Sequence, residues 1–189
     1  MPGTGLLFVG RFVPKKGLAD LIAALALLFR EKETDARLTI AGDGPDAAAL
    51  RARAEALGVA ARISWLGVVP REHLRTQLRQ HTCLVVPSTV APDGDRDGIP
   101  NVVLEAMAVG TPVVGTDAGS LPEVLSPETG WVCEPQNPAA LAALIRSCSG
   151  NSAERARRGA RARQQIETRF DAVALARQRA ALFGVCPDA

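Results

Sequence analysis

The sequence of 189 residues lacks closely spaced cysteines. Its four cysteines, Cys83, Cys133, Cys148 and Cys186, are scattered along the chain, and no secretory signal precedes them. Disulfide frameworks and structural zinc sites depend on cysteines at short, regular spacings, so neither kind of site is expected. We therefore expect a reducing, cytoplasmic compartment.

Long hydrophobic runs and a strong net charge are missing too. The longest apolar run, LADLIAALALLF at 18–29, has 12 residues and includes Asp20. A membrane-spanning helix needs about 20 apolar residues, so this run predicts a buried helix instead. The formal net charge of +2 is too small to indicate a nucleic-acid partner.

Two further patterns of chemistry are absent. No G-x-S-x-G motif accompanies Ser88 or Thr89, which argues against a hydrolase triad. His73 and His81 have no companion ligands, so no metal site is predicted. The arginines at 155–163 are typical of a solvated helix face, and association with an anionic membrane surface stays open as the alternative.

The dominant pattern is a regular alternation of strands and helices. It predicts an α/β fold of three layers, in which a Rossmann-like, doubly wound parallel sheet of about six strands has helices on both faces. Residues 6–189 form one domain, and residues 1–5 are interpreted as a linker remnant. Strands are predicted at 6–10, 37–42, 62–67, 82–87, 111–116 and 130–134, and helices at 17–32, 45–57, 72–80, 100–110, 121–125, 138–148, 152–169 and 171–183.

The doubly wound strand order 3-2-1-4-5-6 places the first and fourth strands side by side, and ligands bind beyond their carboxyl ends. The loop after the first strand holds Arg11, Lys15 and Lys16. The loop after the fourth strand holds Asp97 and leads to a helix near Pro100, since proline fits the first helical position. The topology therefore predicts that cations, a carboxylate and a helix N-terminus meet at one point.

The segment DGDRDGIPNVVLEAMAVG at 93–110 has the least ordinary pattern. Its helix has almost no polar face, so we expect it to be buried on most sides. Glu105 lies within this helix, eight residues after Asp97. A buried carboxylate costs free energy unless it is hydrogen-bonded, which indicates a functional role. The alternative is that Glu105 lies on a narrow wet stripe with Asn101.

These groups suit a nucleoside diphosphate that carries a hydroxyl-rich group. Arg11 and Lys16 can hold phosphate oxygens, although both could instead be solvated loop charges. Glu105 can accept hydrogen bonds from both hydroxyls of a ribose, and Asp97 would face the group beyond the second phosphate. A helix N-terminus also favours an anion. The stretch that forms it comprises Gly98, Ile99, Pro100, Asn101 and Val102.

Four motifs carry a resemblance to a known family. GR-x4-KG follows the first strand, GDGP follows the second and LG-x-VP follows the third. D-x7-E, running into LEAMA-x-GTPVV, follows the fourth strand. Together they resemble the C-terminal domain of GT-B glycosyltransferases, in the retaining group called family 4. The resemblance covers nearly the whole chain and implies a domain that binds a nucleotide-sugar donor.

The resemblance also implies roles for single residues. Arg11 and Lys16 would hold the diphosphate and stabilise the leaving group. Glu105 would bind the ribose. Asp97 would contact the donor sugar near its reacting carbon, as a catalytic residue, at a position where the family usually has glutamate. The sugar would pass from the nucleoside diphosphate to an acceptor hydroxyl with retained configuration, without a metal or another cofactor.

Further expectations follow from the same resemblance. The turn around Val69 and Arg71 would meet the base, and family frequency favours UDP over GDP. The family's N-terminal domain, which carries the acceptor site, is absent from this chain. We therefore expect the chain alone to bind donor weakly and to transfer no sugar. The resemblance implies polysaccharide or glycolipid biosynthesis in the cytoplasm, with a lipid-linked acceptor at the inner face of the membrane as one option.

Two alternatives come from other classes of protein. GDGPDA at 42–47 fits G-x-G-x-x-A between a strand and a helix, which would suit an NAD(P)-binding domain. This motif follows the second strand rather than the first, no acidic residue ends the next strand, and Pro45 crowds the turn. The other alternative is a non-catalytic sensor of nucleotide sugars, which would keep the same binding residues.

Overall fold

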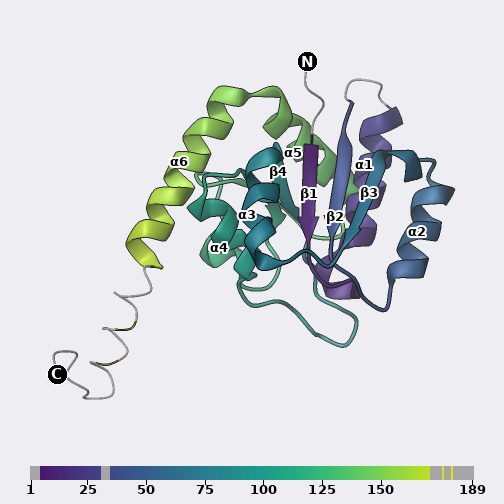
Figure 1. Cartoon of the computed structure of the whole chain (residues 1–189), viewed down its shortest axis with the longest axis horizontal. Helices are drawn as coiled ribbons and strands as arrows, with labels where there is room; N and C mark the ends of the chain where they lie inside the picture. The colour runs from purple at the N-terminus through teal and green to yellow at the C-terminus, as the bar shows by residue number, and fades with distance from the viewer. Residues whose placement is uncertain (1–4, 31–34, 171–175, 177–179, 181–189) are drawn as a thin grey trace.

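The computed structural model describes residues 5–30, 35–170, 176 and 180 (Figure 1). In this part of the chain six parallel strands form one sheet, in the predicted order β3-β2-β1-β4-β5-β6. Gly5, which the predicted linker included, is the first residue of β1. The strands are β1 Gly5–Val9, β2 Arg37–Ala41, β3 Ile63–Gly67, β4 Cys83–Val86, β5 Val113–Thr116 and β6 Trp131–Cys133.

The helices also follow the predicted alternation. The α-helices are α1 Leu18–Arg30, α2 Ala47–Ala56, α3 Arg71–Gln80, α4 Asn101–Ala108, α5 Pro138–Gly150 and α6 Ser152–Arg169. Short 3-10 helices lie at η1 Pro14–Lys16, η2 Ala60–Arg62 and η3 Leu121–Glu123. Of the helix expected at 171–183 only residues 176 and 180 are described, and both are helical. The end of the helix expected at 17–32 lies outside the described residues.

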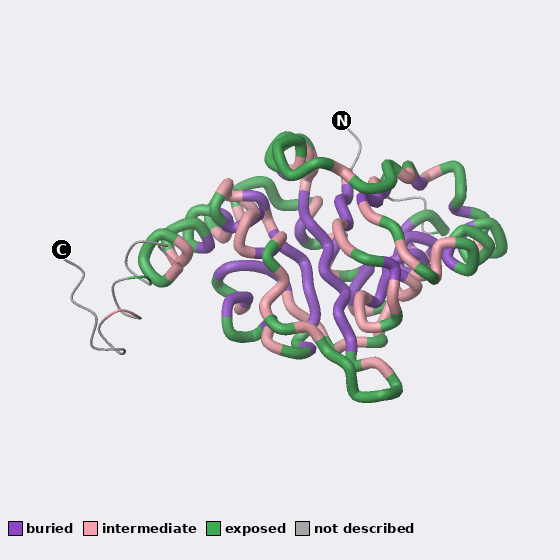
Figure 2. The backbone as a smooth tube through the Cα atoms, turned by 60° about the horizontal axis from the view of Figure 1, so that its bottom comes forward, coloured by how far each residue is buried: buried purple, intermediate pink, exposed green. Residues whose placement is uncertain are grey.

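Helices cover both faces of the sheet, which gives the predicted three layers (Figure 1). Successive side chains of a strand point to opposite faces. Leu6 and Phe8 of β1 accordingly join a core with α1, α2 and α5, whereas Leu7 joins a second core with α3, α4 and α6. The central strands β4 and β5 are buried throughout (Figure 2), as parallel strands covered on both faces must be.

The two tryptophans of the sheet differ in burial. Trp131 on β6 is buried, whereas Trp65 on the edge strand β3 is only half-buried. The guanidinium of Arg51 lies over the Trp65 ring, 4.4 Å from its centroid, and Phe12 meets the same ring edge-on. A cationic and an aromatic group thus cover part of the ring at this edge.

The structure corrects two predictions about α4. The helix is not buried on most sides, because only Val103, Ala106 and Met107 are buried, and the side with Asn101 and Ala108 is exposed. Its apolar composition reflects packing between the sheet, α3 and α6 rather than enclosure. The helix begins at Asn101, so proline 100 precedes the first helical residue instead of occupying it.

The thiols of Cys83, Cys133 and Cys148 are free, and Cys186 lies outside the described residues. Across the described ranges, no helix combines the length and apolarity needed to cross a bilayer.

Candidate functional site

The loops after β1 and β4 lie against each other at the carboxyl ends of these neighbouring strands. The strands pair through Leu6 and Cys83, and the loops are joined by a hydrogen bond of 2.8 Å from the Thr89 N–H to the Lys15 carbonyl. Gly17 has φ 63°, and a Cβ added there would lie 1.7 Å from the carbonyl oxygen of Pro87. The predicted convergence of these two segments is therefore confirmed, backbone against backbone.

A short 3-10 helix, η1, directs two lysines toward the second loop. Pro14 begins η1 and Gly17 ends it in the left-handed conformation. The Lys16 Nζ lies 2.7 Å from Oδ2 of Asp97, and both side chains are largely buried, with exposed fractions of 21% and 10%. The Lys15 Nζ lies 2.9 Å from Asp95 and 3.7 Å from Oδ1 of Asp97. Asp97 thus lies between two ammonium groups.

A third loop, at 117–120 after β5, holds the backbone of Asp97. The Ser120 N–H donates to the Asp97 carbonyl at 3.2 Å, and Gly119 has φ 60°. A Cβ on Gly119 would lie 2.3 Å from the same carbonyl oxygen, so only glycine permits this approach. The hydroxyl of Ser88 also donates to the Asp97 carboxylate at 3.4 Å. Sequence reasoning missed this loop, whose signal is the glycine in AGSLP.

The stretch from residue 98 to residue 102 leads from the Asp97 loop into α4. Gly98 and Asn101 are exposed, whereas Ile99, Pro100 and Val102 are half-buried. Proline has no side-chain acceptor, so Pro100 gives α4 no side-chain cap. The Val103 N–H donates to the Pro100 carbonyl at 2.9 Å, which leaves the N–H groups of Asn101 and Val102 without a partner among the described residues. These donors follow Asp97 by four and five residues.

Arg11 and Val69 line a separate pocket of about 290 Å³ beyond β1, β2 and β3. The Arg11 side chain is exposed, and it has no ion-pair partner among the residues that the structure describes. The other lining residues are Val9, Gly10, Ala41, Gly42, Asp43 and Val68.

The GDGP turn at 42–45 packs against the loop that carries Arg11. The Phe12 N–H donates to the Asp43 carbonyl at 2.9 Å, and the Asp46 N–H donates back to the Phe12 carbonyl at 3.3 Å. A Cβ on Gly44 would lie 2.5 Å from the Phe12 carbonyl oxygen. The protein's own backbone thus occupies the space that a dinucleotide pyrophosphate would need above these glycines, which argues against the NAD(P)-binding alternative.

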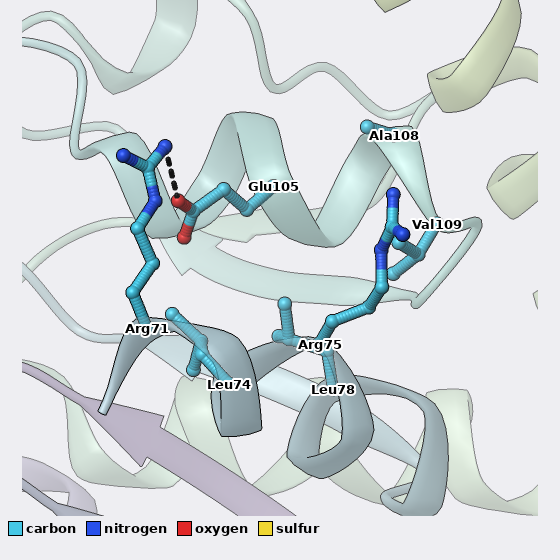
Figure 3. A pocket seen from close by; sticks show the side chains of 7 residues that line it. All are labelled: Arg71, Leu74, Arg75, Leu78, Glu105, Ala108 and Val109. Atoms are coloured by element: carbon cyan, nitrogen blue, oxygen red, sulfur yellow. Dashed lines mark ion pairs between the residues drawn. The ribbon is translucent and has the colours of Figure 1, made fainter. Parts of the chain in front are cut away.

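Glu105 and Arg71 meet across a groove between α3 and α4 (Figure 3). The Arg71 Nη2 lies 3.4 Å from Oε1 of Glu105, whose side chain is 30% exposed. Glu105 is therefore not fully buried, and it lies with the exposed Asn101 on the partly wet stripe that the alternative interpretation predicts. The groove has a volume of about 270 Å³, and its other lining residues are Leu74, Arg75, Leu78, Ala108 and Val109.

Comparison with known proteins identifies the family. The family model described as "Glycosyl transferases group 1" matches residues 4–165. The chain belongs to the group 1 glycosyl transferases. A glycogen synthase from Mycobacterium tuberculosis (strain ATCC 25618 / H37Rv) is 37% identical over 174 residues, which are 90% of this chain and 40% of that protein. The amylovoran biosynthesis glycosyltransferase AmsK of Erwinia amylovora is 32% identical over 88% of this chain and 41% of its own length.

Solved structures of glycosyl transferases share the fold. Anabaena HepE, in complex with UDP-glucose, superposes with a TM-score of 0.86 at 24% identity, over 97% of this chain and 49% of that one. The C-terminal domain of the group 1 protein LpcC from Francisella tularensis superposes with a TM-score of 0.77 at 22% identity, over 91% and 89%. The fold is therefore that of a C-terminal GT-B domain. This group 1 transferase chain spans less than half the length of the curated relatives named above.

The two residues expected at the base of the nucleotide lie apart in this group 1 domain. Val69 lines the pocket with Arg11, whereas the Arg71 side chain reaches the other groove and Glu105. Sequence reasoning placed both in one turn because they are two residues apart. The backbone between them changes from loop to helix, and α3 begins at Arg71.

The α6 arginines of this group 1 domain bind within the domain. Glu154 accepts hydrogen bonds from Arg157 and Arg158 at 2.6–2.7 Å, which lower the pKa of its carboxyl to about 2. Arg155 donates to the carbonyls at the end of α5, and Arg163 pairs with Glu167 at 2.8 Å. Arg157, Arg161 and Arg163 are exposed, as predicted for a solvated helix face, whereas Arg155 and Arg158 are half-buried and correct that prediction. Within the described ranges, no group of three or more His, Cys, Asp or Glu side chains is placed to hold a metal ion.

Lys15 is expected to titrate above its ordinary range. Its hydrogen bond to Asp95 raises its pKa from 10.5, and the negative charges of Asp95 and Asp97 raise it further. Partial desolvation lowers the pKa and offsets part of this rise. Because the folded-state pKa is raised, the stabilisation is present below pH 10.5 and is lost as pH rises through the folded value. A 13C NMR titration of the Lys15 side chain should show a raised pKa that falls in Asp95→Asn. An ordinary pKa in the wild-type domain would contradict the contact.

Proposed function

We propose that this domain binds a nucleoside diphosphate sugar and is the donor half of a retaining transferase that passes the sugar to an acceptor hydroxyl. The observation that carries the proposal is the ion pair of Lys16 with Asp97 at the carboxyl ends of β1 and β4, on the loop that leads into the start of α4. This is where open parallel sheets bind their ligands.

The diphosphate would lie between η1 and the start of α4. Lys16 supplies a point charge held in place by Asp97 at 2.7 Å, and Arg11 supplies an exposed guanidinium that can bind phosphate oxygens in bidentate fashion. The first N–H groups of α4 add partial positive charge. Asp97, fixed between lysines and by the 117–120 loop, would face the sugar near its reacting carbon.

The chemistry follows from this distribution of charge. As the bond between the sugar and the phosphate breaks, positive charge develops on the sugar and negative charge on the departing diphosphate. Lys16, held in place by Asp97, the exposed Arg11 and the α4 N–H groups are proposed to stabilise that negative charge, a role that a metal ion can also fill. The cations of the chain are therefore proposed to suffice without a metal. Retention of configuration is part of the same proposal.

UDP is proposed as the preferred nucleotide over GDP. Anabaena HepE, which shares the fold, was solved with UDP, with UDP and glucose, and with UDP-glucose. A GDP-mannose-dependent mannosyltransferase of Corynebacterium glutamicum, 30% identical over 85% of this chain, supports GDP as the second candidate. Glu105 would bind the ribose that both nucleotides share.

The acceptor is proposed to bind to a further domain. This chain covers 40% of the glycogen synthase and 41% of AmsK, so these relatives have room for another domain of similar size. We expect the 189 residues alone to bind donor weakly and to show no turnover. Robust sugar transfer by this chain would contradict that expectation.

A thermal-shift panel tests the nucleotide assignment. UDP, GDP, ADP and NADH are titrated against the domain, and UDP at 100 times its dissociation constant should stabilise the fold by about 2.7 kcal/mol. Arg11→Ala and Glu105→Ala should lose most of this shift, because they remove proposed contacts to the diphosphate and the ribose. An unchanged response of both variants would contradict the placement. A shift with NADH alone would favour dinucleotide binding.

A further inference from the structure

The two carboxylates of the proposed donor site are neutralised in different ways. Asp97 and Lys16 form a short pair of 2.7 Å between largely buried side chains, and Ser88 supports it. Glu105 and Arg71 form a longer pair of 3.4 Å, and the Arg71 side chain is 89% exposed. Only the first pair is built into the packing of the domain. The second is held by a side chain that solvent surrounds.

Arg71 reaches Glu105 from another helix. It is the first residue of α3, directly after Pro70, and its side chain extends over the mouth of the groove toward α4 (Figure 3). Its guanidinium contacts the carboxylate on the side that faces away from the apolar floor of Leu74 and Leu78. Arg75, one turn further along α3, lies beside Val109 and does not reach Glu105.

We propose that Arg71 is a gate over the ribose site, which pairs with Glu105 until a nucleoside binds and then leaves it. This inference rests on the proposed function, which gives Glu105 to the ribose. A ribose diol donates two hydrogen bonds to a carboxylate, and one of the two oxygens, Oε1, is the atom that Arg71 contacts. A carboxylate oxygen can accept more than one hydrogen bond, so the proposed competition is for the space beside Oε1, where the Arg71 guanidinium lies in this structure.

The exposure of Arg71 makes such a gate easy to open. Exposed ion pairs shift an equilibrium by at most about fivefold, because water already solvates both groups. The gate thus weakens nucleotide binding slightly and selects ligands that offer a diol in exchange for the arginine. A nucleotide without ribose hydroxyls gains nothing from displacing Arg71, because it has no donor for the freed carboxylate.

The test compares Arg71→Ala with Arg75→Ala by calorimetric titration of UDP and of 2′,3′-dideoxy-UDP. Both substitutions remove one positive charge from the same face of α3 and the same groove, so Arg75→Ala controls for long-range attraction of the diphosphate. Relative to Arg75→Ala, Arg71→Ala should bind UDP two- to fivefold more tightly. The affinity for dideoxy-UDP should be equal in the two variants. In a Glu105→Gln background the gain of Arg71→Ala should disappear.

The outcomes separate the gate from the function on which it rests. If the wild-type domain binds neither UDP nor GDP, the proposed function is wrong, and the gate proposal, which rests on it, is wrong as well. If UDP binds but Arg71→Ala weakens it more than Arg75→Ala does, Arg71 contacts the nucleotide and the gate alone is wrong. Equal UDP affinities of the two variants, or an equal gain for dideoxy-UDP, also overturn the gate.

Discussion

Replacing Lys16 with alanine is expected to weaken UDP binding by about 10- to 100-fold. A hydrogen bond to a charged group contributes about 1.5–3 kcal/mol, and each 1.4 kcal/mol is a factor of ten in affinity. The substitution also removes the 2.7 Å partner of Asp97, which leaves Lys15 at 3.7 Å as the nearest cation. Calorimetric titration of UDP measures the loss directly.

Lys15→Ala is the matched control for this prediction. It removes the same charge from the neighbouring position of η1, but its main partner is Asp95 at 2.9 Å rather than Asp97. The affinity for UDP should therefore fall much less. Equal losses in the two variants would show that only the total positive charge of the loop matters, and the specific role of Lys16 would be wrong.

Gly17→Ala is expected to destabilise the domain by roughly 2–5 kcal/mol. Gly17 has φ 63°, a conformation that costs an L-residue about 1–2 kcal/mol, and overpacking adds about 1–3 kcal/mol. The added Cβ would lie 1.7 Å from the Pro87 carbonyl oxygen, so the loops after β1 and β4 must separate. Urea unfolding gives the stability change, and the same variant should bind UDP more weakly because its two binding loops no longer meet.

Gly58→Ala separates the two causes. Gly58 also has a positive φ, 71°, but nothing lies within 4 Å of a Cβ placed there. It should cost only the conformational part, about 1–2 kcal/mol, and leave UDP affinity unchanged. If Gly17→Ala were no more destabilising than Gly58→Ala, the close approach of the two loops would be wrong.

The sheet order could be predicted because the signals for it are local. Apolar runs of strand length alternate with helical runs, and central strands such as β4 and β5 are apolar on both faces. The doubly wound order then places the loops after β1 and β4 together without any knowledge of side-chain contacts. That is why the meeting of Lys16 with Asp97 could be predicted as a neighbourhood, though not as a pair at 2.7 Å.

Other features depend on packing that no local pattern records. Arg71 meets Glu105 because α3 and α4 cover the same face of the sheet, and nothing near either residue in the sequence indicates this. The contact of Gly119 with the Asp97 backbone likewise joins loops that follow different strands. The burial of α4 was overestimated because composition shows which residues are apolar but not how many neighbours surround the helix.

All strands of this sheet run in one direction, so the loops at their carboxyl ends lie on one side of the domain and their amino ends lie on the other. Every loop proposed to bind the donor follows the carboxyl end of a strand, whereas Gly5 begins β1 on the opposite side (Figure 1). A fluorophore or sensor surface attached on that opposite side would leave the donor loops facing the solution. With the proposed nucleotide binding, the domain would suit immobilised detection of nucleotides, because the polarity of the strands sets the orientation of the sensor.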